Sequence, residues 1–478
     1  MRNASLAAPT LALALALPSL GLPTSASGQD YYSDIRPVIV ETCMRCHIEE
    51  GVGWSMEDPD AVYDLRRVIA HVVTSREMPP WLADSHVQEY VNDLSLDEDV
   101  VAVFAAWRDA GFPKGEPRPD PDIRPEPVGA VPANLSLELL PDGSYTPNPS
   151  MDDDYRCFIV DWPWEEPGYV TGFRMEPGNP RIAHHAVVDV VEPEMVERFR
   201  ELEEAEEGPG YQCFSGPAIP ERLFLEEDER AAYEERYPGG LQELIDRSWR
   251  FAVWVPGTWG DAFPEGTGIR IEPGAALAVQ MHYFTGHAPP GEADAGTRIH
   301  LQVADRVERR AFLFPQTRNE WLYGGANRSM VIPPGESATY EVTHDLERLA
   351  PYIDAADVTG VERERIAAFE VHSAFLHMHE TGRSGEVTLV RPDGRSETLL
   401  SVPRWDFDWQ REFTFTEPKV VPREEMTETL LRLRCTYHNS TEEPVYGGFG
   451  SFDEMCVNFS YIAIREGAPE TASTRSGH

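Results

Sequence analysis

The stretch Leu277-Ala278-Val279-Gln280-Met281-His282-Tyr283-Phe284 follows a Pro273-Gly274 turn and is rich in apolar and aromatic residues. Short runs of this kind, separated by Pro-Gly, Asp-Gly and Gly-Gly turns, recur at Ala186–Val191, Ile269–Ile271, Glu386–Val390 and Val457–Ile464. Regularly spaced short strands with such turns are typical of β-sandwiches and jelly rolls. We therefore expect two all-β domains, at residues 133–305 and 306–466, with an acidic helical insertion at Pro193–Glu207.

The chain before these strands has a different pattern. Apolar residues at helical spacing, with little strand signal, predict a small all-α domain over residues 29–113; they lie around Ile35–Thr42, Val62–Val73 and Asp97–Ala110. Prolines that alternate with charged residues at 114–132 predict a stiff, extended linker. Residues 467–478 are expected to form a disordered tail.

The net charge limits the partners of the protein. Its 478 residues carry a formal charge of −41, which disfavours binding to nucleic acid or to an anionic membrane surface. Cations and positively charged redox partners would be attracted. The alternative interpretation is that the acidic surface only keeps the protein soluble.

Residues 1–28 have the pattern of a secretory signal peptide. Arg2 precedes an apolar run at Leu11–Leu22, and small residues at Ser25–Gly28 offer a cleavage site. No later stretch is long and apolar enough to predict a membrane span. We therefore expect a periplasmic or secreted protein.

The chain has six cysteines, and two of them lie in the sequence Cys43-Met44-Arg45-Cys46-His47. This C-x-x-C-H motif predicts a covalently bound haem c, with His47 as an iron ligand. Met78, in a Met-Pro turn after a helix, is the expected sixth ligand, and His71 is the alternative. With both axial positions filled, the haem would transfer electrons. The other four cysteines predict two disulfides, with three possible connectivities.

Histidines and methionines collect at four places in the β-rich part, namely His184-His185, Gln280-Met281-His282-Tyr283, His377-Met378-His379 and Met455. On a strand, His377 and His379 would project from one face and could share a metal. Adjacent His184 and His185 would point to opposite faces unless a bulge or a strand end breaks the alternation. Imidazoles suit copper or zinc, and a thioether favours copper. The alternative is that these histidines are unrelated core or surface residues.

In this order the motifs resemble the copper type II, ascorbate-dependent monooxygenases, a family that includes peptidylglycine α-hydroxylating monooxygenase and dopamine β-monooxygenase. The resemblance extends from about Tyr155 to Ile464. It implies two copper sites, with one triad that transfers electrons and another that binds oxygen and is catalytic; the ligands are His184, His185 and His282 in the first, and His377, His379 and Met455 in the second. It also implies the disulfides Cys157–Cys213 and Cys435–Cys456.

The sequence departs from the peptide-amidating branch of that family. Phe375 stands where that branch has an arginine that binds the substrate carboxylate. Val457 and Phe459 replace an asparagine and a tyrosine that serve the same purpose. Without these polar groups, recognition of an anionic peptide is not expected, and a neutral or apolar substrate is favoured.

The sequence therefore predicts an exported copper-dependent monooxygenase with two copper ions and one haem c. It would hydroxylate a C–H bond of a small neutral or apolar substrate with O2, and an external electron donor would reduce the haem. The linker would hold the haem near the copper domains at a local concentration of roughly millimolar. The alternatives are a non-enzymatic periplasmic copper-binding or electron-transfer protein and a ligand-binding sandwich without copper.

Overall fold

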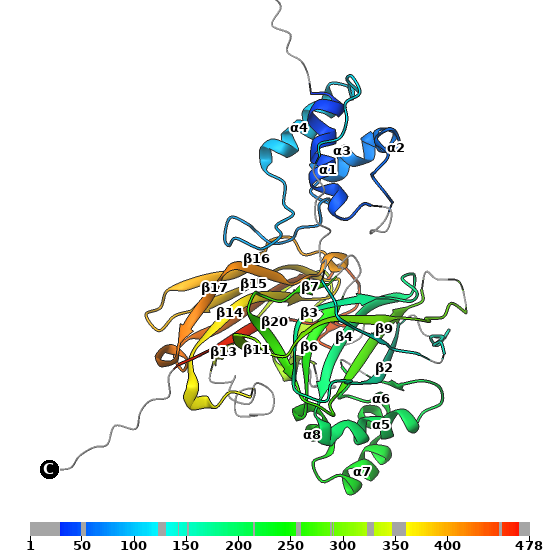
Figure 1. Cartoon of the computed structure of the whole chain (residues 1–478), viewed down its shortest axis with the longest axis vertical. Coiled ribbons are helices and arrows are strands. Elements are labelled where there is room, and N and C mark those ends of the chain that lie inside the picture. The colour runs from blue at the N-terminus through cyan, green and yellow to red at the C-terminus, as the bar shows by residue number, and fades with distance from the viewer. Residues whose placement is uncertain are drawn as a thin grey trace, which may run out of the picture.

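The computed structural model describes residues 29–467, apart from residues 49–53, 123–130, 142, 151–152, 214–215, 255–259, 287–288, 290, 323–328, 347–359 and 449–451. The expected signal peptide, residues 468–478 of the expected tail and part of the proline-rich linker lie outside this set. Among the described residues β-strands dominate, which is consistent with the predicted β-sandwich domains. Figure 1 shows helices gathered in one body above the sheets and in a second group at the opposite end.

The first described part of the chain contains short helices around a small apolar core. It has a π-helical turn, four α-helices and a 3-10 turn, at Tyr31–Ile35, α1 (Arg36–Glu41), Cys43–Arg45, α2 (Pro59–Asp64), α3 (Arg66–Thr74) and α4 (Glu98–Asp109). Helix α2 begins where the Asp58 side chain accepts hydrogen bonds from the first backbone N–H groups and Pro59 presets the backbone. Buried side chains from α3 and α4, such as Ile69 and Trp107, close the core of this helical unit.

A five-stranded sheet contains the apolar stretch Leu277–Phe284. Its order is β5 (Tyr211–Gln212), β2 (Asp153–Asp161), β9 (Ala276–Phe284), β4 (Ala183–Val191) and β6 (Ser248–Trp254). Strand β9 is its middle strand, and every residue from Ala276 to Tyr283 is buried. A continuous apolar run fits a strand that is covered on both faces.

A nine-stranded sheet runs through both halves of the β-rich part. Its order is β1 (Leu135–Glu138), β10 (Arg298–Ala304), β3 (Gly168–Glu176), β8 (Thr267–Ile271), β11 (Arg309–Gln316), β20 (Val457–Glu466), β14 (Ile366–His377) and β17 (Phe413–Pro422), and β7 (Asp261–Ala262) pairs with β3. The parallel pair β8 and β11 joins the two halves. The boundary expected at 305/306 therefore falls between β10 and β11, two strands of one shared sheet.

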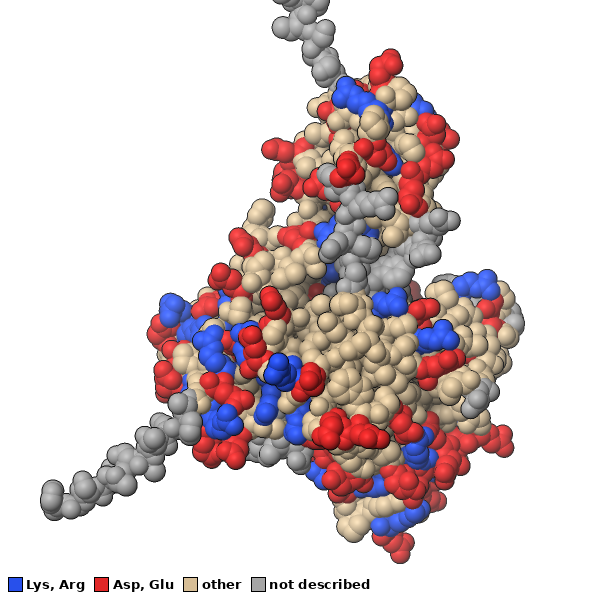
Figure 2. Space-filling model, in the orientation of Figure 1, with Lys and Arg blue, Asp and Glu red and all other residues tan. Residues whose placement is uncertain are grey.

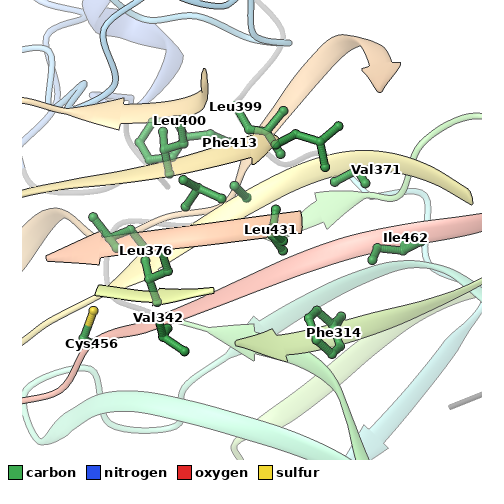
Figure 3. Close-up of a cluster of buried hydrophobic side chains, with 14 of the residues drawn as sticks. Phe314, Val342, Val371, Leu376, Leu399, Leu400, Phe413, Leu431, Cys456 and Ile462 are labelled. Atoms are coloured by element: carbon green, nitrogen blue, oxygen red, sulfur yellow. The ribbon is translucent and has the colours of Figure 1, made fainter. Parts of the chain in front are cut away.

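The second half adds a four-stranded sheet of order β13 (Ser337–Asp345), β18 (Leu430–His438), β15 (Gly382–Val390) and β16 (Ser396–Val402). The short strands β12 (Val331–Ile332) and β19 (Val445–Tyr446) form a pair of their own. Apolar side chains of this sheet and of β11, β14, β17 and β20 share one core, part of which Figure 3 shows. Leu376 and Cys456 lie in that core, so the residues that directly precede His377 and follow Met455 are anchored.

Helical insertions cover one end of the first half, as predicted for Pro193–Glu207. They comprise a 3-10 turn and four helices, at Pro193–Met195, α5 (Val196–Glu204), α6 (Glu221–Leu225), α7 (Glu227–Arg236) and α8 (Gly240–Asp246). A short helix α9 (Asn319–Leu322) and 3-10 turns at Arg363–Arg365, Phe407–Trp409 and Arg423–Glu425 lie in later connections. Figure 2 shows acidic side chains crowded over the end of the molecule where α5 and α7 lie.

Both disulfides implied by the resemblance are present. Cys157 is joined to Cys213, and Cys435 to Cys456. Cys43 and Cys46 are free. In the described part of the chain, no helix has the length and apolar character that crossing a bilayer requires.

Candidate metal centres

His184, His185 and His282 come together at one end of the five-stranded sheet. His184 and His185 open β4, and His282 lies near the end of the neighbouring β9. The register of β4 against β9 shifts between Ala183 and His185. This irregularity is the break in alternation that the adjacent histidines require, and it lets both rings face His282.

The three rings of this first cluster face one another through the same ring atom. The Nδ1 of His282 lies 3.1 Å from Nδ1 of His184 and 3.2 Å from Nδ1 of His185. On its other side, Nε2 of His282 lies 2.8 Å from a carboxylate oxygen of Asp153. The carboxylate accepts a hydrogen bond from Nε2–H, which leaves the lone pair of His282 on Nδ1. Tyr155 stacks flat on the His282 ring, at 4.1 Å between centroids, and fixes its plane.

Burial keeps the first cluster in the form that binds metal. Burial, together with the smaller effect of the neighbouring His282, lowers the pKa of His184 to about 4. It also holds the pKa of His185 well below its usual range. Neutral imidazoles with converging lone pairs repel one another unless a cation lies between them. The imidazole donors and the convergence of their three lone pairs therefore both fit a bound metal ion.

His377 and His379 form a second cluster at the end of β14. His377 is the last residue of that strand, and His379 lies two residues beyond it, so the expected placement of both on one regular strand is wrong. Pairing of β14 with β20 ends at His377, where the chain turns towards β15. Their ring centroids are nonetheless 5.1 Å apart, so the turn brings the imidazoles together in another way.

The second cluster has the opposite protonation pattern to the first. Nδ1 of His377 lies 2.5 Å from Oε1 of Gln410, and Nδ1 of His379 lies 2.9 Å from the backbone carbonyl of Asp453. Both partners are acceptors, so each Nδ1 carries the proton and each Nε2 carries the lone pair. Burial lowers the pKa of His377 to about 3, which keeps this ring neutral as well.

Glu454 connects this turn to the segment that carries Met455. Its carboxylate accepts hydrogen bonds from the backbone N–H of His379 at 2.9 Å, of Thr381 at 2.7 Å and of Met455 at 3.2 Å. The backbone carbonyl of Met455 accepts from the Tyr437 hydroxyl at 2.7 Å, and the next residue is held by the Cys435–Cys456 disulfide. The sequence did not predict this role for the buried Glu454, because the spacing of a Glu in a loop does not indicate which N–H groups it will accept from.

Both clusters open onto one cavity of about 600 Å³. His185 of the first cluster lines it together with His377, His379 and Met455. The ring of Phe407 lies 5.6 Å from that of His184 and 5.9 Å from that of His379, between the clusters.

The other walls of the cavity combine apolar and polar side chains. Phe375, Val457 and Phe459, the three departures noted in the sequence, all line it. Arg250 also lines it, but its guanidinium is paired with Asp189 at 3.0 Å. The charge of this arginine is therefore already compensated, and sequence reasoning gave no sign of the pair.

The C-x-x-C-H motif lies directly after α1 in the helical unit. Nδ1 of His47 lies 3.1 Å from the backbone carbonyl of Trp54, an acceptor, which leaves Nε2 for an iron ion. Two free thiols beside such a histidine fit the donor set of haem c. The side chain of His71 is 73% exposed, which makes it a poor axial ligand, and Met78 is half-buried in the turn after α3.

A known protein family and a known protein sequence are similar to this chain. Residues 325–469 match the family model described as "Copper type II ascorbate-dependent monooxygenase, C-terminal domain". Dopamine beta-hydroxylase of Rattus norvegicus is 22% identical over 320 residues, which cover 65% of this chain and 43% of the relative. The chain thus spans less than half of that relative's length. Both findings support the copper type II ascorbate-dependent monooxygenase family, and with it a copper-dependent monooxygenase.

Solved structures give only distant likenesses. The major capsid protein P2 from Bacteriophage PM2 has a TM-score of 0.24 at 10% identity, covering 72% of this chain and 99% of that one. A structure of the infectious bursal disease virus Gx strain has a TM-score of 0.17 at 11% identity, covering 70% and 64%. Scores this low carry no argument about this protein.

Proposed function

We propose that this protein is an exported copper-dependent monooxygenase that hydroxylates a C–H bond of a small neutral or apolar substrate with O2. Its electrons would come from an external donor through haem c. The observation that carries the proposal is a single cavity onto which two neutral histidine clusters open, with Met455 and apolar side chains in its walls.

Each cluster would hold one copper ion through a different set of atoms. In the first, the three Nδ1 atoms of His184, His185 and His282 are the donors. In the second, they are the Nε2 atoms of His377 and His379 and the sulfur of Met455. Copper would supply one-electron chemistry and O2 activation when bound. Asp153, Gln410 and the Asp453 carbonyl hold the rings in the protonation states that leave these donors free.

The side chains that line the cavity would determine which substrates bind. Phe375, Val457 and Phe459 offer apolar surface beside the second cluster and no partner for a carboxylate. A charged substrate would lose hydration there without gaining a hydrogen bond, which costs several kcal/mol, of order 2–7 kcal/mol for a polar group. The Arg250–Asp189 pair leaves no net charge on that side of the cavity.

Haem c would be held by Cys43, Cys46 and His47, with Met78 as the sixth ligand. Four of the six cysteines are paired in disulfides, which is typical of proteins from oxidising compartments and supports a periplasmic or secreted location.

The test is metal and haem analysis of the purified protein, followed by O2 uptake with a panel of small apolar and phenolic compounds. We expect two coppers and one haem per chain, and O2 uptake that depends on one class of compound. Copper without any substrate-dependent uptake would instead indicate a copper carrier or electron-transfer protein. Absence of copper after reconstitution would leave only a binding module.

A further inference from the structure

Part of the helical unit is built into the second β-domain. Residues 79–94, which follow Met78 and which we call the strap, run along strands β16 and β17. The backbone N–H of Asp84 donates to Ser401 at 2.8 Å, that of Val91 to Thr414 at 2.8 Å, and that of Thr416 to Glu89 at 3.1 Å. The strap therefore lies across the edges of two sheets, at β16 of the four-stranded sheet and β17 of the nine-stranded sheet, and forms an isolated β-bridge between Tyr90 and Phe415.

Side chains of the strap also enter the apolar core. Leu82, Ala83 and Tyr90 are buried in the same core as Phe413 and Phe415. The ring of Trp81 lies 5.1 Å from that of Phe413, and the Tyr90 hydroxyl donates to the Leu399 carbonyl at 3.2 Å. Burial of this kind holds the helical unit in one position. The sequence predicted that the proline-rich linker alone would tether this unit, whereas the strap adds a docked contact.

The connection between β16 and β17, residues 403–412, contacts the helical unit from the other side. The guanidinium of Arg404 donates to the carbonyls of Ser75, at 3.2 Å, and Arg76, at 2.7 Å, at the end of α3. The guanidinium of Arg411 lies over the Trp81 ring at 5.1 Å.

The same connection contacts the metal-binding turn. Gln410 binds Nδ1 of His377 through its Oε1, and the indole N–H of Trp405 donates to the His379 carbonyl at 3.1 Å. The amide of Gln410 donates to the Phe407 carbonyl at 3.0 Å, which braces the connection internally. The connection contacts the first cluster through the ring of Phe407, which lies 5.6 Å from that of His184.

We propose that the connection 403–412 is the route by which electrons pass from haem c to the copper site of His377 and His379, and not first to the three-histidine site. This inference rests on the proposed function. One electron leaves Fe(II), which becomes Fe(III), and reduces Cu(II) to Cu(I), with no bond made or broken. Arg411 lies over the ring of Trp81, three residues after Met78, and its neighbour Gln410 binds His377, so two adjacent positions of the chain link the strap to the second cluster.

The experiment is flash photoreduction of the haem in the full-length, copper-loaded protein without O2 or substrate. Reoxidation of the haem by Cu(II) is followed by its absorbance. Two variants each lose one cluster, His377→Ala with His379→Ala and His184→Ala with His282→Ala. Metal analysis must find one copper and one haem in each of them, which also shows that the variants fold.

We expect rapid haem reoxidation in the variant without His184 and His282, and loss of the rapid phase in the variant without His377 and His379. The reverse pattern would overturn the proposed route. If the unaltered protein shows no haem reoxidation by either copper, electron delivery by the haem fails as well. Substrate-dependent O2 uptake with ascorbate as donor tests the monooxygenase itself separately.

Gln410→Leu tests the route at a single residue. It should slow haem reoxidation while the haem spectrum stays unchanged and copper at the second site is restored by excess metal. Gln242→Leu, on exposed helix α8, is the matched control and should leave the rate unaltered. Equal rates in the two variants would exclude Gln410 from the route.

Discussion

The two histidine clusters differ in how the fold builds them. The first lies within one sheet, on neighbouring strands β4 and β9, and its rings face one another through Nδ1. The second is assembled from the end of β14 and a distant loop after β19, and its rings are free at Nε2. Which ring nitrogen remains free is set by the acceptor that each histidine finds on its other side.

This difference suggests a division of labour. Three imidazoles on paired strands are held by backbone hydrogen bonds, so their positions can change little between oxidation states. The second cluster combines two imidazoles with a thioether, which favours Cu(I), and it lies against Phe375, Val457 and Phe459. We therefore propose, as the family resemblance implies, that the second cluster oxidises the substrate and the first supplies the second electron. On the route proposed above, electrons from the haem enter the copper sites at the second cluster.

Removal of the second cluster should have the largest effect. His377→Ala with His379→Ala should abolish substrate-dependent O2 uptake and reduce copper from two ions to one per chain, because both donor imidazoles are lost. O2 electrode traces and metal analysis measure this. Reduced haem should also be reoxidised by O2 no faster than in a copper-free protein. Retention of two coppers would contradict the assignment.

Loss of the Met455 thioether alone should affect the second copper site and leave the first unchanged. Met455→Ala should leave folding and the three-histidine copper intact but abolish substrate-coupled O2 uptake. Met455→Leu should behave in the same way, because it keeps the side-chain volume and removes the sulfur. Met378→Leu is the control, since Met378 is fully buried between the two histidines and points into the core. Full turnover in Met455→Leu would remove this residue from the site.

Changes in the hydrogen-bond partners should affect one cluster at a time. Asp153→Asn should weaken copper binding at the first cluster by about 10–100-fold, because a neutral amide no longer fixes the proton on Nε2 of His282. The second cluster should keep its affinity. Titration with a copper chelator resolves the two sites, and equal weakening of both would show that Asp153 acts on the fold and not on the ring.

Removal of the two disulfides should give the smallest difference between the two halves of the molecule. Loop-closure entropy predicts a stability loss of about 4 kcal/mol for Cys157→Ala with Cys213→Ala, and about 3 kcal/mol for Cys435→Ala with Cys456→Ala. The order follows from sequence separations of 56 and 21 residues. Only the second pair should also weaken copper at the His377 cluster, because it adjoins Met455. Denaturant unfolding and chelator titration measure the two effects.

Local residue patterns predicted several elements of the fold. The apolar run at β9 predicted a strand, and the acidic segment at 193–207 predicted a helical insertion. Joint metal binding by the adjacent histidines required a bulge or a strand end, and the register of β4 shifts between Ala183 and His185, near the start of that strand. Such predictions succeed because alternation and turn residues act over a few neighbouring positions.

Other features arose from contacts between distant segments. Counting cysteines left three pairings open, and the resemblance to a family was needed to choose between them. The sequence did not predict the hydrogen-bond roles of Asp153, Gln410 and Glu454, because an acceptor gains such a role only beside the ring or turn that it holds. The nine-stranded sheet and the docked strap likewise depend on pairings across the whole chain.

The sequence by itself determined which donor atoms are available: two thiols and a histidine for haem, five imidazoles and a thioether for copper, and short strands to carry them. Only the tertiary structure decided which nitrogen of each imidazole is free, that both clusters share one cavity, and that the helical unit docks beside the second. The reason is physical. A residue type fixes its chemistry wherever it stands, whereas protonation, burial and proximity depend on neighbours that the fold brings from far along the chain.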